Sequence, residues 1–97
     1  MAFIQIVEFT TSKYDEVEAL ERQYDQDTGD KSTVRRTIVT RDHSDPTKVR
    51  VLVFFDSYES AMENSNLPET AAFGEKVGGL IDGPMTFHDL DVIDDRE

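Results

Sequence analysis

The sequence has 97 residues, of which 37% are hydrophobic and 32% are charged, a composition typical of one folded domain and not of a disordered chain. Its 21 acidic and 10 basic residues give a formal net charge of −11, which disfavours nucleic acid and anionic membrane surfaces as partners. The absence of cysteine excludes disulfides and thiol catalysis and fits a reducing, cytoplasmic location.

No apolar segment approaches the roughly 20 residues that a membrane-spanning helix needs. The N-terminal stretch carries an acid and has no basic residue before Lys13, which does not fit a secretory signal. We therefore expect a single domain over residues 1–97 with an acidic C-terminal tail at residues 93–97.

The first expected strand covers residues 3–10, with apolar side chains on both faces and Gln5 as the polar residue on one of them. A helix should follow, with Ser12 as its N-terminal cap and Gly29 as its stop. Its apolar residues recur at spacings of three and four and form a narrow stripe: Tyr14, Val17, Leu20 and Tyr24.

A β-branched stretch at residues 32–40 predicts a second strand, which carries two adjacent arginines. The third expected strand covers residues 48–55. The turn residues Asp45 and Pro46 lie between them, so these two strands should form a hairpin.

A second helix should begin with Asp56 or Ser57 as its cap. Proline cannot continue a helix but suits a first turn, so the helix should break and restart at Pro68, with Asn66 as the new cap. Glycines then lead into a last strand at residues 84–92.

The order strand, helix, strand, strand, helix, strand predicts an α+β fold, the ferredoxin-like βαββαβ plait, with an antiparallel sheet in the order 4-1-3-2. The first and third expected strands are the most apolar, as central strands should be. The second and fourth carry the charges that are typical of edge strands.

The third strand is apolar on both faces, although the helices of a plait cover only one. Four such side chains left in water forfeit about 6–12 kcal/mol, at roughly 1.5–3 kcal/mol each, while a small domain has only about 5–15 kcal/mol of stability. An exposed surface of this kind marks an interface, so we predict a homodimer joined sheet to sheet. The residues concerned are Val49, Val51, Val53 and Phe55 on one side, and Leu52 and Phe54 on the other.

The stretches "FFDSYESAMENSNLPET" (residues 54–70) and "FHDLDV" (87–92) resemble the strand-to-helix junction and the closing strand of antibiotic biosynthesis monooxygenase domains, members of the dimeric α/β-barrel superfamily. The resemblance extends over nearly the whole chain, and its motifs are mostly structural. It implies a hydrophobic cavity between sheet and helices in each subunit.

Some members of that family oxidise a polycyclic aromatic substrate with dioxygen, without metal or flavin, because the deprotonated substrate itself supplies the electrons. The resemblance thus implies an oxidoreductase without cofactor or metal. Another branch degrades haem with a first-strand asparagine and with a tryptophan and a histidine around the second helix. This sequence has Gln5 on the first strand, no tryptophan, and no histidine in the second helix, so haem degradation is not expected.

His88 and Gln5 are the candidate catalytic residues. His88 lies in the last expected strand, where a neutral imidazole can accept a proton from an acidic phenol or carbon acid; the alternative is a hydrogen-bonded edge histidine. Gln5 can orient a ligand carbonyl; the alternative is a structural hydrogen bond across strands or a dimer interface.

Further candidates could line a ligand cavity from the second helix or serve only as core and capping residues: Tyr58, Met62, Asn64, Phe73 and Val77. Arg36 and Arg50 could bind a carboxylate or enolate, or form ordinary surface ion pairs. The acidic stretch from Asp25 lacks the twelfth-position acid of a calcium loop, and the residues around His43 are too few for a site, so no metal is expected.

Two functional hypotheses follow. The first is a cofactor-independent monooxygenase that acts on a small aromatic or polyketide-like molecule. The second is a non-catalytic dimer that binds a small ligand or serves as an accessory protein. A cavity of roughly 300 Å³ or more with His88 or Gln5 in its wall would favour the enzyme.

Overall fold

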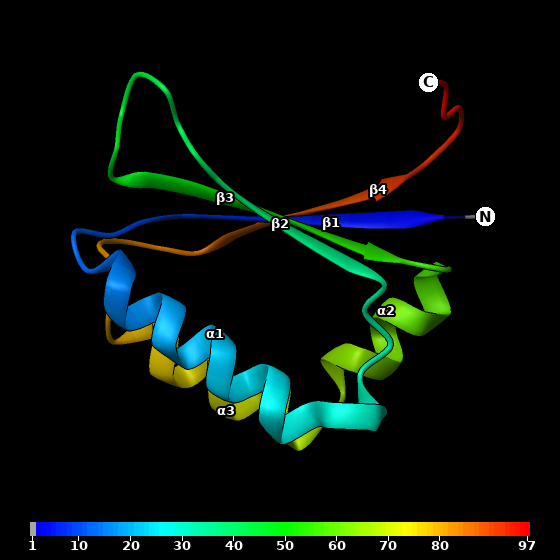
Figure 1. The fold of residues 1–97 in the computed structure, drawn as a ribbon, viewed down its shortest axis with the longest axis horizontal. Helices are drawn as coiled ribbons and strands as arrows, with labels where there is room; N and C mark the ends of the chain where they lie inside the picture. The colour runs from blue at the N-terminus through cyan, green and yellow to red at the C-terminus, as the bar shows by residue number, and fades with distance from the viewer. Residues whose placement is uncertain (1) are drawn as a thin grey trace.

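The computed structural model describes residues 2–97. Figure 1 shows a twisted sheet with all helices on one side. The elements are β1 (Phe3–Thr10), α1 (Tyr14–Thr28), a 3₁₀ turn (Gly29–Lys31), β2 (Arg36–Arg41), β3 (Lys48–Phe55), α2 (Tyr58–Ser65), α3 (Pro68–Gly78) and β4 (Thr86–Asp91). The sheet order is β2-β3-β1-β4, and every neighbouring pair is antiparallel, which confirms the predicted plait.

The central strands β1 and β3 have the predicted bounds, but β2 begins four residues later than expected. The reason lies in Thr33, whose polar groups bond to α2 instead of the sheet. Its hydroxyl donates to the Ser60 carbonyl at 2.6 Å, and its N–H donates to Asn64 Oδ1 at 3.4 Å. This segment therefore connects the helix layer to the sheet before β2 starts.

Ser57 caps α2 as predicted, because its hydroxyl accepts the Ser60 N–H at 3.1 Å. The prediction for Ser12 was wrong. Lys13 precedes α1 without a side-chain cap, and its own N–H donates to the hydroxyl of Thr11 at 3.0 Å. A buried threonine one position earlier thus organises this turn.

The break between α2 and α3 is where the sequence predicts it, with Pro68 as the first residue of α3. Asn66 does not cap α3, which corrects the prediction. Leu67 occupies the capping position in an extended conformation, and no side-chain hydrogen bond is made there. The backbone restriction that proline imposes on the preceding residue explains this extended conformation.

The hydrophobic core fills the space between the helices and the lower face of the sheet. One cluster of buried side chains joins the sheet to α1 and α3: Phe9, Val17, Val49, Val51 and Val77. A second joins β1 and β3 to α2: Phe3, Phe55 and Ala61. Because alternate residues of a strand share a face, these contacts show which face of each strand the helices cover.

The opposite surface, here called the open face, has no helix over it (Figure 1). Its apolar half consists of Ile4, Ile6, Ile38, Leu52, Phe54 and Leu90, which are cross-strand partners or neighbours in the sheet. At its other end Arg50 pairs with Glu8 at 3.3 Å and with Asp42 at 2.9 Å. The loop between β2 and β3 and the C-terminal end rise on this bare side.

The edge strand β4 differs from the rest of the sheet because all six of its residues are exposed. It hydrogen-bonds to β1, and the helices leave its lower face uncovered. None of the helices in residues 2–97 combines the length and the apolar character that a membrane crossing requires.

Candidate functional site

Gln5 and His88, the two predicted catalytic residues, lie on opposite faces of the sheet. Gln5 alternates with the buried Phe3 and therefore faces the helix layer. His88 is the cross-strand partner of Ile6 and therefore belongs to the open face. A single binding site within one chain cannot use both side chains.

Gln5 is held by Asp89, its cross-strand partner. The amide Nε2 donates to Asp89 Oδ1 at 3.0 Å, which leaves the amide oxygen of Gln5 free to accept a bond from elsewhere. Phe87 lies on the same face of β4 with 55% of its surface exposed. Tyr58 meets the ring of Phe3 edge-on, with 5.6 Å between ring centroids. We call the side chains on this part of the helix-facing side the β4 shelf: the partly buried Gln5, and the exposed Asp89, Phe87 and, beside Phe3, Tyr58.

The remaining predicted ligand residues are largely used in packing. Val77 is 1% exposed within the core. Phe73 stacks on Tyr24 at 4.7 Å between ring centroids, and Met62 packs against the cluster around Phe55. Side chains therefore occupy much of the space between helices and sheet where the family resemblance implies a cavity.

Asn64 is buried at the end of α2, where it ties three segments together. Its Nδ2 donates to the Tyr24 hydroxyl at 3.0 Å, and its Oδ1 accepts from the Thr33 N–H. Its backbone carbonyl accepts the Thr70 hydroxyl at 2.6 Å. This network pairs the polar atoms of a buried side chain, which is a sufficient structural role for Asn64.

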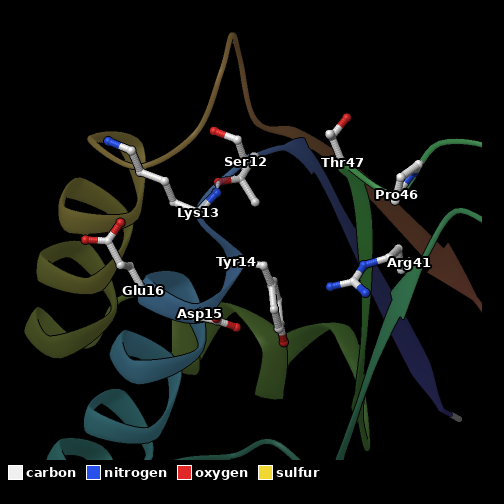
Figure 2. A pocket seen from close by; sticks show the side chains of 9 residues that line it. Ser12, Lys13, Tyr14, Asp15, Glu16, Arg41, Pro46 and Thr47 are labelled. Carbon is white, nitrogen blue, oxygen red and sulfur yellow. Dashed lines mark hydrogen bonds between the residues drawn. The ribbon is translucent and has the colours of Figure 1, made fainter.

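A pocket of about 610 Å³ opens between the start of α1, the end of β2 and the loop before β3 (Figure 2). Arg41 projects from β2 toward the ring of Tyr14, and its guanidinium carbon lies 5.8 Å from the ring centroid. The remaining wall residues are Thr11, Ser12, Lys13, Asp15, Glu16, Pro46 and Thr47. A cation, an aromatic ring and hydroxyl groups thus meet in one concave site.

A second, smaller pocket of about 90 Å³ lies between α1 and α3, where Leu20, Tyr24 and Phe73 form part of its wall. Neither this pocket nor the larger one is lined by Gln5 or His88. The larger pocket has the volume of a ligand site, but its chemistry comes from residues other than the two predicted catalytic ones.

Glu21 is the residue with the most unusual acidity. It is partly buried on α1, and burial, together with the charges of Asp25 and Glu18, raises the pKa of its carboxyl from 4.5 to about 7. Burial also raises the pKa of the Tyr14 hydroxyl, with further contributions from Glu21 and Glu18. A carboxyl that titrates near neutrality can exchange a proton under physiological conditions.

No group of three or more histidine, cysteine or acidic side chains in the described part of the chain is arranged to hold a metal ion. The residues with binding chemistry are instead the amide and carboxylate of the β4 shelf and the cations near Tyr14. Of the two arginines considered from sequence, Arg50 is paired with Glu8 and Asp42. Arg36 lies over the Phe54 ring at 5.9 Å.

Sequence reasoning missed Asp89 as the partner of Gln5, and it missed Arg41 as a pocket residue. Asp89 carried no signal, because acids are common on edge strands and the register of β4 against β1 was unknown. Arg41 and Tyr14 are far apart in the sequence, and only the tertiary fold brings the start of α1 close to the end of β2.

No protein-family model and no curated protein sequence matches this chain. Solved structures do match in fold. The structure of Rv0793 from Mycobacterium tuberculosis aligns over 100% of both chains with 15% identity and a TM-score of 0.80. A Caulobacter crescentus protein assigned as an antibiotic biosynthesis monooxygenase shares 14% identity over 96% of this chain and 91% of its own, with a TM-score of 0.82.

SnoaB from Streptomyces nogalater, named as a cofactor-independent oxygenase, aligns over 97% of this chain and 95% of its own. Its sequence identity is 8% and its TM-score is 0.82. At these identities the comparisons establish the fold and not the activity. The chain therefore has the ferredoxin-like fold of the antibiotic biosynthesis monooxygenases, as the sequence resemblance implies.

Proposed function

We propose that the protein acts as a homodimer whose two sheets meet through their open faces. The apolar half of the open face supports this, since Leu90 is 43% exposed and its neighbours are only partly buried. The strand positions of that half carry no acid although the chain has 21, so two copies can approach without burying carboxylates against one another, and Arg36 on the edge strand β2 is the charged residue that borders the contact. A two-fold contact of identical apolar surfaces is the simplest closed assembly.

We further propose that this dimer is a cofactor-independent monooxygenase for a small aromatic molecule. The observation that carries this proposal is the fold, which is shared along nearly the whole chain with one structure named as an antibiotic biosynthesis monooxygenase and one named as a cofactor-independent oxygenase. In such a reaction an activated CH₂ group loses a proton, and the resulting carbanion supplies electrons to O₂. One oxygen atom becomes the product carbonyl and the other leaves as water with the two hydrogens.

The β4 shelf supplies the groups for this chemistry. Phe87 and Tyr58 present exposed aromatic surface for a flat substrate. Gln5 would orient the substrate carbonyl, and Asp89, fixed at 3.0 Å from the Gln5 amide, would accept the proton. His88 points to the open face, so a role for it would require a substrate held between the two subunits.

Oxygen consumption with anthrone as the probe tests this proposal. Anthrone loses two hydrogens at its CH₂ group and gains one oxygen, giving anthraquinone and water. Gln5→Ala should lower the protein-dependent rate at least tenfold at unchanged melting temperature. Gln23→Ala is the matched control, because Gln23 makes a similar amide–carboxylate bond to Asp27 at 2.8 Å on α1. Equal rates in both variants would remove Gln5 from the mechanism.

The second candidate function is non-catalytic binding of a small aromatic ligand. It is favoured by one specific observation, namely that neither described pocket is lined by Gln5 or His88. Under this alternative, anthraquinone should raise the melting temperature, because a ligand that binds only the folded state stabilises it. Anthrone should then be oxidised no faster than in buffer alone.

A further inference from the structure

We propose that the pocket between Tyr14 and Arg41 is a binding site for a small aromatic compound that carries a single negative charge, such as an arylcarboxylate or a phenolate. This site is separate from the β4 shelf and from the open face. It therefore stands or fails independently of the proposed oxygenase activity.

The first argument concerns the free cation. Arg41 takes part in none of the ion pairs within residues 2–97, although acids outnumber bases two to one. Those pairs engage Arg22, Lys31, Arg35, Arg50 and Arg96. An arginine whose guanidinium is not committed to a carboxylate retains its planar set of donors for an anionic ligand.

The second argument concerns the aromatic wall. Tyr14 is partly buried, and the guanidinium of Arg41 lies 5.8 Å from its ring centroid, so cation and ring are already arranged on the same site (Figure 2). Because the guanidinium lies over one face of the Tyr14 ring, a flat ligand can contact the edge of this ring while its anionic group bonds to the edge of the guanidinium. Ser12 adds a hydroxyl group to the wall, and the hydroxyl of Thr47, which donates to Asp45 Oδ1 at 2.7 Å, is left only as an acceptor.

The third argument concerns size and charge. A pocket of about 610 Å³ lies within the range of small-molecule sites, roughly 300–1,000 Å³. Its wall contains two basic residues, Lys13 and Arg41, and two acidic residues, Asp15 and Glu16, and Arg41 forms an ion pair with neither acid. A ligand with several negative charges, such as a nucleoside triphosphate, would meet these carboxylates and the strongly acidic surface. One negative charge on an aromatic frame fits best.

The experiment is a titration of the isotopically labelled protein with 2-naphthoate, followed by amide chemical shifts. Shifts should concentrate in residues 11–16, at Arg41 and at Thr47. The Arg41→Gln variant should bind 2-naphthoate at least tenfold more weakly. The neutral analogue 2-naphthalenemethanol should bind the unaltered protein at least tenfold more weakly than 2-naphthoate does. Tyr14→Leu should weaken both ligands, because the aromatic wall of the pocket is lost.

The matched control is Arg36→Gln. Arg36 lies over the Phe54 ring at 5.9 Å, nearly the same geometry as Arg41 and Tyr14, but on the open face and outside the pocket. Its substitution should leave the affinity for 2-naphthoate unchanged. Arg41→Lys keeps the positive charge but loses the planar guanidinium, so it should retain part of the affinity for 2-naphthoate.

Three results would overturn the proposal. They are equal affinities of the acid and the alcohol, an unchanged affinity in a folded Arg41→Gln variant, and shifts that fall outside the pocket or do not occur at all. Failure of the anthrone assay would leave all of these measurements meaningful, because none of them depends on turnover.

Discussion

The two faces of the sheet are built from similar apolar residues but differ in how far one chain can cover them. On the helix side, Val49 and Phe55 retain 1% and 4% of their exposed surface. On the open face, Leu52 and Phe54 remain partly exposed, although they alternate with those residues along the same strand. The comparison teaches that β3 has the composition of a strand buried on both faces, while the helices bury only one.

The two faces also differ in their polar residues. Gln5 is the polar residue among the apolar side chains of β1 on the helix side, and its amide nitrogen donates to Asp89. The open face instead gathers its ion pairs at one end, where Arg50 lies between Glu8 and Asp42, while Arg36 lies over the Phe54 ring on the edge strand at the other end. This separation leaves a continuous apolar half, which is the surface that the proposed dimer would use.

The largest expected effect is a loss of folding stability from a substitution on the helix-covered face of the sheet. Phe55→Ala removes a side chain that packs against Phe3 and Ala61, and it should lower the free energy of unfolding by about 3–5 kcal/mol. Urea denaturation followed by circular dichroism measures this change. A loss below about 1 kcal/mol would mean that this face is not the main source of stability.

Leu52→Glu tests the open face. The variant should remain folded, because Leu52 lies outside both buried clusters, but a carboxylate in the apolar half should weaken self-association at least a hundredfold. Sedimentation velocity should show twice the mass of one chain for the unaltered protein and a single chain for the variant. Ala71→Glu, on the exposed surface of α3, should leave the mass unchanged. An unaltered protein that is folded and monomeric would contradict the proposed dimer.

Asn64→Ala tests how the helix layer is held against the sheet. The substitution removes the bonds from Asn64 to the Tyr24 hydroxyl and the Thr33 N–H, and it should lower the free energy of unfolding by about 1–3 kcal/mol. Ser65→Ala, at the exposed neighbouring position, is the control and should change stability little. Thermal unfolding of both variants checks the difference.

Glu21→Gln is expected to have the smallest effect, and one that depends on pH. In the folded state the pKa of Glu21 is raised to about 7, so ionisation is disfavoured there relative to the unfolded chain. Below pH 4.5 the carboxyl is protonated in both states. Between about 4.5 and 7 the unfolded chain ionises first, and stability falls; above 7 the penalty is complete.

The variant should therefore melt at the same temperature as the unaltered protein near pH 4 and about 4 °C higher near pH 8. This corresponds to about 1 kcal/mol once solvent screening of a partly exposed group is allowed for. Differential scanning calorimetry at the two pH values measures it. Equal melting temperatures at pH 8 would show that the Glu21 carboxyl ionises as freely as in the unfolded chain.

The sequence was sufficient to predict the strand order and the bounds of β1 and β3, because continuous apolar runs distinguish central strands from charged edges. The caps were harder to assign. Ser12 is a good capping residue by type, but Thr11 makes the organising bond because its buried hydroxyl also donates to the Leu80 carbonyl at 2.7 Å. Such a contact depends on a loop nearly seventy residues away.

The candidate site was less predictable. The last strand carries an apolar residue on each face, Phe87 on one and Leu90 on the other, so its pattern does not reveal which face meets the helices. Only the register of β4 against β1 shows that His88 and Gln5 lie on opposite faces of the sheet. The Tyr14–Arg41 pocket depends in the same way on tertiary packing, since neither residue is exceptional in its own segment.

The exposed strand β4 has a consequence for how copies of the protein meet at high concentration. Within residues 2–97, β4 pairs with β1 alone, so its outer margin carries free backbone donors and acceptors that another strand could extend. Asp89 and Asp91 place negative charge on one face of this edge strand, which would repel the same strand of a second copy. Open polymerisation through this edge is therefore disfavoured. At high concentration the protein should form closed oligomers with a fixed number of subunits.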